Sequence, residues 1–243
     1  MPSRPLSSSH PDYPAVAPVV DALHRQAGGA SAFETEIPRL LRIAIDEVID
    51  APRTGRFTLS EISKTEKSYV GTKVEIIIQD FLQLPRGTSM DLSVDGVEVD
   101  IRNTVGLNWS IPKETLGHLA LLVRESETTA KCYVGIVVVM DAYLNPGENR
   151  DTKRGLSKAG SANVWWMLAD HPYPPNFWEI LPLRDRNSIL AAGGGTARIA
   201  ALFEKLQRMP ISRMQVQALA QQHDYMKLFD GTAAQEISWL KRE

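Results

Sequence analysis

The chain has 243 residues, 43% of them hydrophobic and 23% charged, with a formal net charge of −2. These values are typical of a globular chain with one large domain, alone or with a small appendage. A single cysteine, Cys132, excludes a disulfide framework and favours a reducing compartment. No apolar run is long enough to span a membrane, and the first residues lack the apolar core of a secretory signal, so we expect a cytoplasmic protein. The net charge leaves nucleic-acid binding open, because local basic surface decides phosphate contact.

The predicted elements begin after residues 1–14, which are rich in Ser, Pro and His and are expected to form a disordered tail. Helical hydrophobic spacing predicts amphipathic helices over residues 36–49 and 64–82. Apolar runs predict strands over 118–123 and 132–140, and the second run is so apolar that an interior strand is expected. Residues 165–168 are interpreted as a buried helix. Three glycines at 193–195 are interpreted as a hinge, which divides the chain into a main domain over 15–192 and a helical module over 193–243.

Between these elements, Asp95-Gly96 stands amid alternating residues, which is the strongest short signal of a β-hairpin. A two-residue turn there places Asp91 directly across from Asp100, with both side chains on one face. The hairpin is open to two interpretations. Its polar face can simply lie in water. Alternatively, the two opposed carboxylates, which repel each other, hold a divalent cation such as Mg²⁺. Glu75, in the helix that precedes the hairpin, is a candidate third carboxylate.

Further motifs accompany the hairpin in a fixed order along residues 36–230. They comprise Lys64-Thr-Glu-Lys67, Val70-Gly-Thr72, Glu75, Asp91, Val99-Asp-Ile101, Trp109-x-Ile-Pro112, Leu144-Asn145, Gly147, Asn149-Arg-Asp151, Lys153 and Trp166. Together they resemble the catalytic domain of the restriction endonuclease NaeI family. The resemblance implies a PD-(D/E)XK nuclease fold, an α/β architecture with a mixed β-sheet flanked by helices and a small helical C-terminal module. It places Glu75, Asp91 and Asp100 at the family's acidic, metal-binding positions.

The chain departs from the family in two respects. The family's catalytic lysine falls at Arg102, which keeps the positive charge but has too high a pKa to deprotonate water. We expect Arg102 to contact the scissile phosphate. The resemblance also implies a larger second DNA-binding domain, of which we expect this chain to retain only the beginning. The residues that fit the pattern of that part are Arg198, Arg213, Gln221, Asp224 and Lys227, and its three cations are predicted DNA contacts.

A polar, basic loop follows the predicted interior strand and is a candidate phosphate contact. Its residues, like the three cations named above, are open to the plainer interpretation of solvated surface. The predicted DNA contacts of this loop are Asn149, Arg150, Lys153, Arg154 and Lys158.

These observations predict a Mg²⁺-dependent DNA endonuclease of prokaryotic defence, with Mn²⁺ able to substitute. Its substrate is double-stranded DNA, which a metal-activated water attacks in line to leave 5′-phosphate and 3′-hydroxyl ends. A monomer with one site would nick, for example within a phosphorothioate-type modification system and beside its other proteins, whereas a twofold homodimer would cut both strands of a palindrome. The main alternative is a nuclease-like DNA-binding module that has lost catalysis. A purely structural interaction protein is the third, and it leaves the opposed carboxylates unexplained.

Overall fold

The computed structural model describes residues 3–207, 211 and 213–220 of the chain. It divides into two units, and each is described by itself. The first unit contains the chain up to Val48 together with Lys64–Pro174, and the second contains Ile49–Ser63 and the chain from Pro175 onward. The boundary therefore lies near residue 174 rather than at the predicted 192, because the segment after Pro175 packs with residues 49–63.

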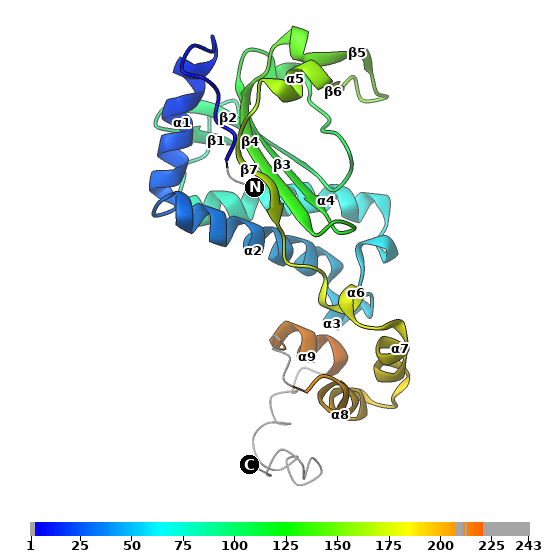
Figure 1. Cartoon of the computed structure of the whole chain (residues 1–243). Helices are drawn as coiled ribbons and strands as arrows, with labels where there is room; N and C mark the ends of the chain where they lie inside the picture. The colour runs from blue at the N-terminus through cyan, green and yellow to red at the C-terminus, as the bar shows by residue number, and fades with distance from the viewer. Residues whose placement is uncertain (1–2, 208–210, 212, 221–243) are drawn as a thin grey trace. The chain divides into compact units, whose positions relative to one another are not determined.

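The first unit is built on a five-stranded mixed sheet in the order β1-β2-β3-β4-β7 (Figure 1). Only the β2–β3 pair is parallel, and the other neighbours are antiparallel. The predicted α/β architecture with a mixed sheet is confirmed. The interior position expected of residues 132–140 is also confirmed, because β4 pairs with both β3 and β7. The strands of this sheet are β1 (Leu92–Val94), β2 (Val97–Thr104), β3 (Leu119–Ser126), β4 (Lys131–Val138) and β7 (Trp165–Pro172).

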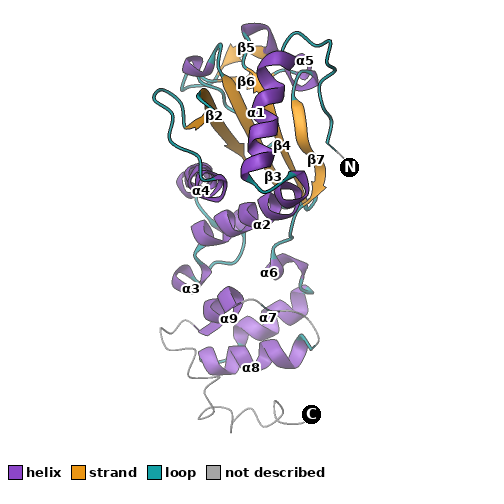
Figure 2. Cartoon of the chain, turned by 90° about the vertical axis from the view of Figure 1, so that its left-hand side faces the viewer, coloured by secondary structure: helices purple, strands orange, loops and turns teal. Residues whose placement is uncertain are grey.

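Three helices accompany this sheet, and Figure 2 shows α1 lying over the strands. They are α1 (Tyr13–Gln26), α2 (Ala30–Ile49) and α4 (Lys64–Leu82). The α4 bounds match the predicted 64–82, and α2 begins six residues earlier than predicted. The ring of Tyr13 on α1 packs against that of Trp165. A Cβ added to Gly71 of α4 would lie 3.9 Å from the Cβ of Asn103, so α4 approaches this residue closely. Strand register and alternation place Trp165 and Asn103 on one face of the sheet, so α1 and α4 cover the same face.

An apolar cluster lies on the opposite face of the sheet and includes residues of the loops that follow β2 and β4. The cluster consists of Trp109, Ile111, Ala120, Leu122, Val137, Val139, Leu144, Leu156 and Val164. A two-stranded sheet and a short helix lie in this region of the chain: β5 (Leu144–Glu148), β6 (Arg154–Leu156) and α5 (Lys158–Ala162). The side chain of Asn108 joins the two loops, because its Nδ2 donates to the carbonyl of Leu156 and its Oδ1 accepts from the Leu156 backbone N–H.

Two predictions for this unit were wrong. Residues 165–168 form an edge strand instead of a helix, because β4 offers a ladder on which their aromatic side chains pack. The expected disordered tail is ordered over residues 3–14. Arg4 exchanges two backbone hydrogen bonds with Trp166 (2.7 and 3.1 Å), and Leu6 is buried. The sheet edge thus satisfies backbone groups that a Ser- and Pro-rich segment cannot pair by itself.

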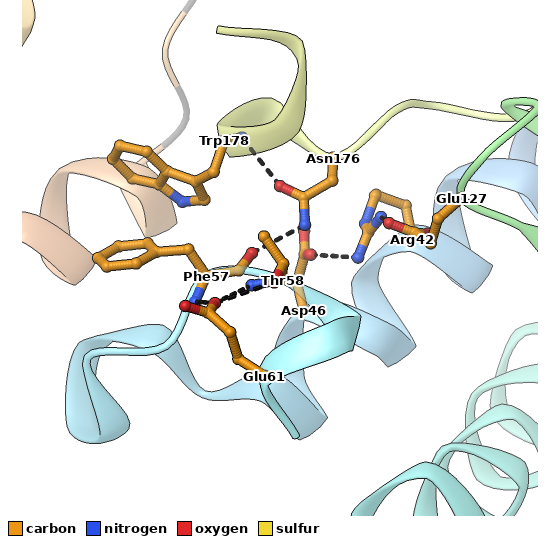
Figure 3. Close-up of polar contacts among 8 residues, drawn as sticks. All are labelled: Arg42, Asp46, Phe57, Thr58, Glu61, Glu127, Asn176 and Trp178. Carbon is orange, nitrogen blue, oxygen red and sulfur yellow. Dashed lines mark hydrogen bonds and ion pairs between the residues drawn. The ribbon is translucent and has the colours of Figure 1, made fainter. Parts of the chain in front are cut away.

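The second unit is helical and combines two distant chain segments (Figure 3). Asn176 Oδ1 accepts from the Trp178 N–H and its Nδ2 donates to the Phe57 carbonyl, both at 2.8 Å. Glu61 Oε2 accepts from the backbone N–H groups of Phe57 and Thr58 at 2.7 and 2.8 Å. The helices of this unit are α3 (Ala51–Thr54), α6 (Phe177–Ile180), α7 (Leu183–Ala191), α8 (Gly195–Lys205) and α9 (Arg213–Ala220).

The glycines at 193–195 join α7 to α8 inside this unit, so the predicted hinge between domains is wrong. Gly195 has a packing role, because an added Cβ would lie 2.2 Å from the Ala220 carbonyl oxygen. The glycine lets α8 and the end of α9 approach at backbone distance. None of the helices within the described residues is long and apolar enough to cross a membrane.

Candidate active site

The predicted hairpin forms with the predicted register. Leu92 pairs with Val99, Ser93 with Glu98 and Val94 with Val97, and the turn residues Asp95 and Gly96 have φ values of 49° and 84°. Positive φ at both positions is the requirement of a type I′ turn, which matches the twist of the flanking strands. Asp91 directly precedes β1, and it therefore lies beside the Asp100–Ile101 segment of β2.

Asp100 is buried, with 1% of its surface exposed. The interpretation that the whole polar face lies in water is therefore wrong at this position. Alternation along a two-stranded hairpin exposes one face, but β2 also pairs with β3 and is covered by the 3₁₀ turn Lys113–Thr115. Thr115 Oγ1 donates to Asp100 Oδ2 at 2.5 Å.

Arg102 also binds the Asp100 carboxylate, through two side-chain donors. Its Nε donates to Asp100 Oδ2 at 2.5 Å, and its Nη2 donates to Oδ1. This bidentate pair joins two residues on the same face of one strand. Arg102 is only partly buried, so its guanidinium stands between the buried carboxylate and the surface.

Asp91 faces the same carboxylate. Its Oδ2 accepts from the Ile101 backbone N–H at 2.7 Å, which fixes the orientation of the side chain. Burial raises the pKa of Asp91, and the neighbouring Asp100 carboxylate raises it further. Two carboxylates that lie this close favour a shared proton or a bound cation.

Glu98 supports the loop that leads into Asp91. Its carboxylate accepts from the backbone N–H groups of Thr88, Ser89 and Met90 at 2.7 to 3.0 Å, and these bonds lower the pKa of Glu98 to about 2. Gly87 is required at the start of this loop, because an added Cβ would lie 2.5 Å from the Met90 carbonyl oxygen.

Glu75 is half-buried on α4, where it lies beside the buried stripe of that helix. Its pKa is raised to about 7, first by burial and then by the charges of Asp91 and Asp100, while Arg102 opposes the increase. The structure therefore brings Asp91, Asp100 and Arg102 together beside β2. Glu75 lies on α4, near enough for their charges to shift its pKa.

The donor set of this cluster suits a hard divalent cation such as Mg²⁺, which prefers carboxylate oxygens. The mutual repulsion that raises the Glu75 pKa is the interaction that such a cation reverses. As the side chains stand, however, no group of three His, Cys, Asp or Glu residues in the described part of the chain is arranged to hold a metal ion. Arg102 and Thr115 together make three hydrogen bonds to the Asp100 carboxylate, so this side chain offers a cation only the remaining lone pair of Oδ1 unless the guanidinium moves away.

Comparison with known proteins identifies the family. The model of the restriction endonuclease NaeI family matches residues 33–242. The chain belongs to the restriction endonuclease NaeI family. It is 32% identical over 201 residues to a type II restriction enzyme NaeI from Lentzea aerocolonigenes, an alignment that covers 79% of this chain and 63% of the relative. The chain therefore spans less than two thirds of that relative's length. The resemblance expected from the motifs is confirmed.

The predicted DNA contacts of this NaeI-family chain lie in different settings. Arg150 and Lys158 are exposed, whereas Asn149 Oδ1 caps its own loop by accepting from the backbone N–H groups of Asp151 and Lys153. Arg154 is engaged within the fold, where it contacts Asp141 and the Asn145 carbonyl.

In the helical unit, Arg198 Nε donates to the Leu219 carbonyl at 3.0 Å and thereby joins α8 to α9. Arg213 begins α9 and is exposed. Lys227 lies outside the described residues. The DNA contacts of these residues stay predictions.

Sequence reasoning missed Thr115 and Glu98 as supports of the site. Neither residue has a pattern that marks it. Thr115 follows the Trp109-x-Ile-Pro112 motif by three residues, and only the folded turn brings it to Asp100. Glu98 lies on the polar side of the hairpin, and its three backbone donors become available only once residues 87–91 fold over it.

Proposed function

We propose that this chain is a divalent-metal-dependent DNA endonuclease. The observation that carries the proposal is the convergence of Glu75, Asp91 and Asp100, with Arg102 bound to the buried Asp100 carboxylate. Membership of the NaeI family supports the reaction class, and the printed name of the relative is that of a type II restriction enzyme. Double-stranded DNA is the proposed substrate, and the cytoplasm is the proposed location.

Each residue of the cluster has a distinct proposed role. Glu75, Asp91 and Asp100 would hold Mg²⁺, or Mn²⁺ in its place, and the bound ion would supply Lewis-acid charge and lower the pKa of water. Arg102 would contact the scissile phosphate with its guanidinium, a geometry suited to phosphate oxygens. Thr115 would keep Asp100 oriented when Arg102 turns from the carboxylate to the phosphate.

Arg102 can exchange its partner, from the Asp100 carboxylate to a phosphate of the substrate. In the folded chain its positive charge neutralises Asp100, and a divalent cation competes for the same two oxygens. An incoming phosphate offers the guanidinium an alternative bidentate partner. Metal binding and phosphate binding would therefore assist each other, since each removes one half of the Arg102–Asp100 pair.

The function is tested by incubating supercoiled plasmid with the full chain and Mg²⁺, beside EDTA and the variant Glu75→Gln. Asp80→Asn is the matched control, because Asp80 is an exposed carboxylate on the same helix. We expect Mg²⁺-dependent cleavage by the wild type and the control. The cleavage rate of Glu75→Gln should be at least a hundredfold lower, which is the usual effect of removing one catalytic contact.

The product distinguishes the finer forms of the proposal. Open-circular DNA indicates a nicking enzyme, whereas linear DNA indicates cleavage of both strands by a twofold homodimer. Cleavage restricted to phosphorothioate-modified or to unmodified plasmid would reveal whether the chain acts with the proteins of a modification system. DNA binding without cleavage of any plasmid in Mg²⁺ or Mn²⁺ would overturn the nuclease proposal and leave the alternative, a nuclease-like DNA-binding module without catalysis.

A further inference from the structure

A cavity of about 440 Å³ lies in the first unit, apart from the carboxylate cluster. This volume lies within the range of about 300–1,000 Å³ that is typical of small-ligand sites. Three aromatic rings and three cations contribute to its lining: Trp109, Tyr133, Trp166, Arg4, Arg124 and Lys158. None of these six residues takes part in the contacts described around Asp100.

The cavity nevertheless shares a face of the sheet with the candidate active site. Thr104, two residues after Arg102 on β2, is the register partner of Arg124 on β3, and Arg124 is the partner of Tyr133 on β4. Register partners project to the same face, and two residues advance a strand by about 7 Å. Arg124 is therefore displaced from Arg102 by about 7 Å along the strand direction and by one strand across the sheet. A length of about 7 Å corresponds to roughly two nucleotides of one DNA strand.

The aromatic part of the lining is a set of adjoining rings. The Trp166 centroid lies 5.9 Å from that of Trp109 and 6.1 Å from that of Tyr133. Trp109 is anchored, because its Nε1 donates to the Val123 carbonyl at 2.8 Å, whereas Trp166 and Tyr133 are only partly buried. Such rings accept a planar base of any sequence by stacking.

The cations of the lining differ in their partners. Arg4 pairs with Asp170, which also accepts from the Tyr133 hydroxyl. Arg124 lies with its guanidinium 5.0 Å from the Tyr133 ring centroid, and its buried Nε has no hydrogen-bond partner among the described residues. Lys158 is exposed. Arg124 thus brings a guanidinium, held over the Tyr133 ring, to the wall of the cavity, and Lys158 brings an exposed ammonium group.

The rim of the cavity carries Leu107, which is 87% exposed. An isolated exposed leucine is ordinary on a protein surface. Here it lies beside an aromatic and cationic cavity, and leucine is among the side chains that DNA-binding proteins insert between base steps.

We propose that this cavity binds a single nucleotide of the DNA substrate whose base has left the helical stack. The base would lie against Trp166 and Tyr133, its phosphate would be held by Arg124 and Lys158, and Leu107 would occupy the space left in the duplex. Enzymes that extrude a base hold it in this way, between aromatic and apolar side chains. The inference rests on the proposed function, because the nucleotide that it assigns to the cavity is part of the DNA substrate.

The site is tested with the four deoxynucleoside 5′-monophosphates as probes, added to the full chain in EDTA. Trp109 and Trp166 line the cavity, so quenching of tryptophan fluorescence reports on its occupation. We expect saturable quenching, with a dissociation constant at least tenfold higher in Lys158→Ala. Lys64→Ala is the matched control, because Lys64 is likewise an exposed lysine at the first position of a helix. Deoxynucleosides without phosphate should bind at least tenfold more weakly than the monophosphates.

The outcomes separate the inference from the function on which it rests. Absence of saturable quenching, or equal weakening by Lys158→Ala and Lys64→Ala, would overturn the nucleotide site even if the chain cleaves plasmid. Quenching by the nucleotides with no plasmid cleavage would refute the nuclease and retain the site. Equal competition by inorganic phosphate alone, at the same concentrations, would show an anion site with no place for a base and would also overturn the proposal.

Discussion

Glu125 provides a prediction that tests the structure independently of function. It is fully buried on β3, and Asn103 Nδ2 donates to its two carboxylate oxygens at 2.8 and 2.7 Å. Burial raises the pKa of Glu125 from 4.5 to about 8, against the lowering effect of the Asn103 hydrogen bond. The folded state therefore keeps a proton on Glu125 at pH values where the unfolded chain has released it.

The sign and size of the effect follow from proton linkage. Because the folded chain binds this proton more tightly, stability falls as the pH rises from about 4.5 to about 8 and is level above that. Each pH unit in this interval removes about 1 kcal/mol from the free energy of unfolding, and the whole interval removes roughly 3–5 kcal/mol. Glu125→Gln abolishes this loss, since the amide oxygen still accepts from Asn103 and carries no titrating proton.

The assay is urea unfolding of the wild type and Glu125→Gln at pH values from 5 to 9. We expect the variant's advantage in free energy of unfolding to grow by about 1 kcal/mol per pH unit up to about pH 8 and then to remain constant. Glu114→Gln, which changes an exposed carboxylate, should show no such growth. A difference between Glu125→Gln and the wild type that is independent of pH would refute the reasoning from burial.

Three further predictions concern the active site and the core. Arg102→Lys should cleave plasmid about tenfold faster, because an ammonium group releases the bidentate hold on Asp100 and can lose its proton; an unchanged or slower rate in a timed plasmid assay contradicts this. Gly87→Ala should lower the free energy of unfolding by about 1–3 kcal/mol, since its Cβ would lie 2.5 Å from the Met90 carbonyl oxygen. Leu122→Ala, in a fully buried position, should cost about 2–5 kcal/mol, and urea denaturation measures both losses.

The sequence predicted those features that local chemistry determines. The Asp95-Gly96 turn set the hairpin register, because two positive φ values suit few other residue pairs. The apolar spacing over residues 64–82 predicted α4, and the observed helix has the same bounds. The motifs and their order along the chain indicated the family and the four residues of the candidate site. In the fold Asp91, Asp100 and Arg102 lie together, and their charges act on Glu75.

The tertiary structure decided whatever depends on distant segments. Residues 165–168 became a strand because β4 supplied a ladder, and Arg4 became ordered because the edge of β7 paired with its backbone. Asp100 was placed by alternation on an exposed face, but Thr115 and Arg102 enclose it. A sequence carries its short-range turn and helix signals in neighbouring residues, whereas burial is a property of what folds over a residue. The sequence therefore predicted the hairpin, whereas tertiary packing determined the buried ion pair between Asp100 and Arg102 that the hairpin carries.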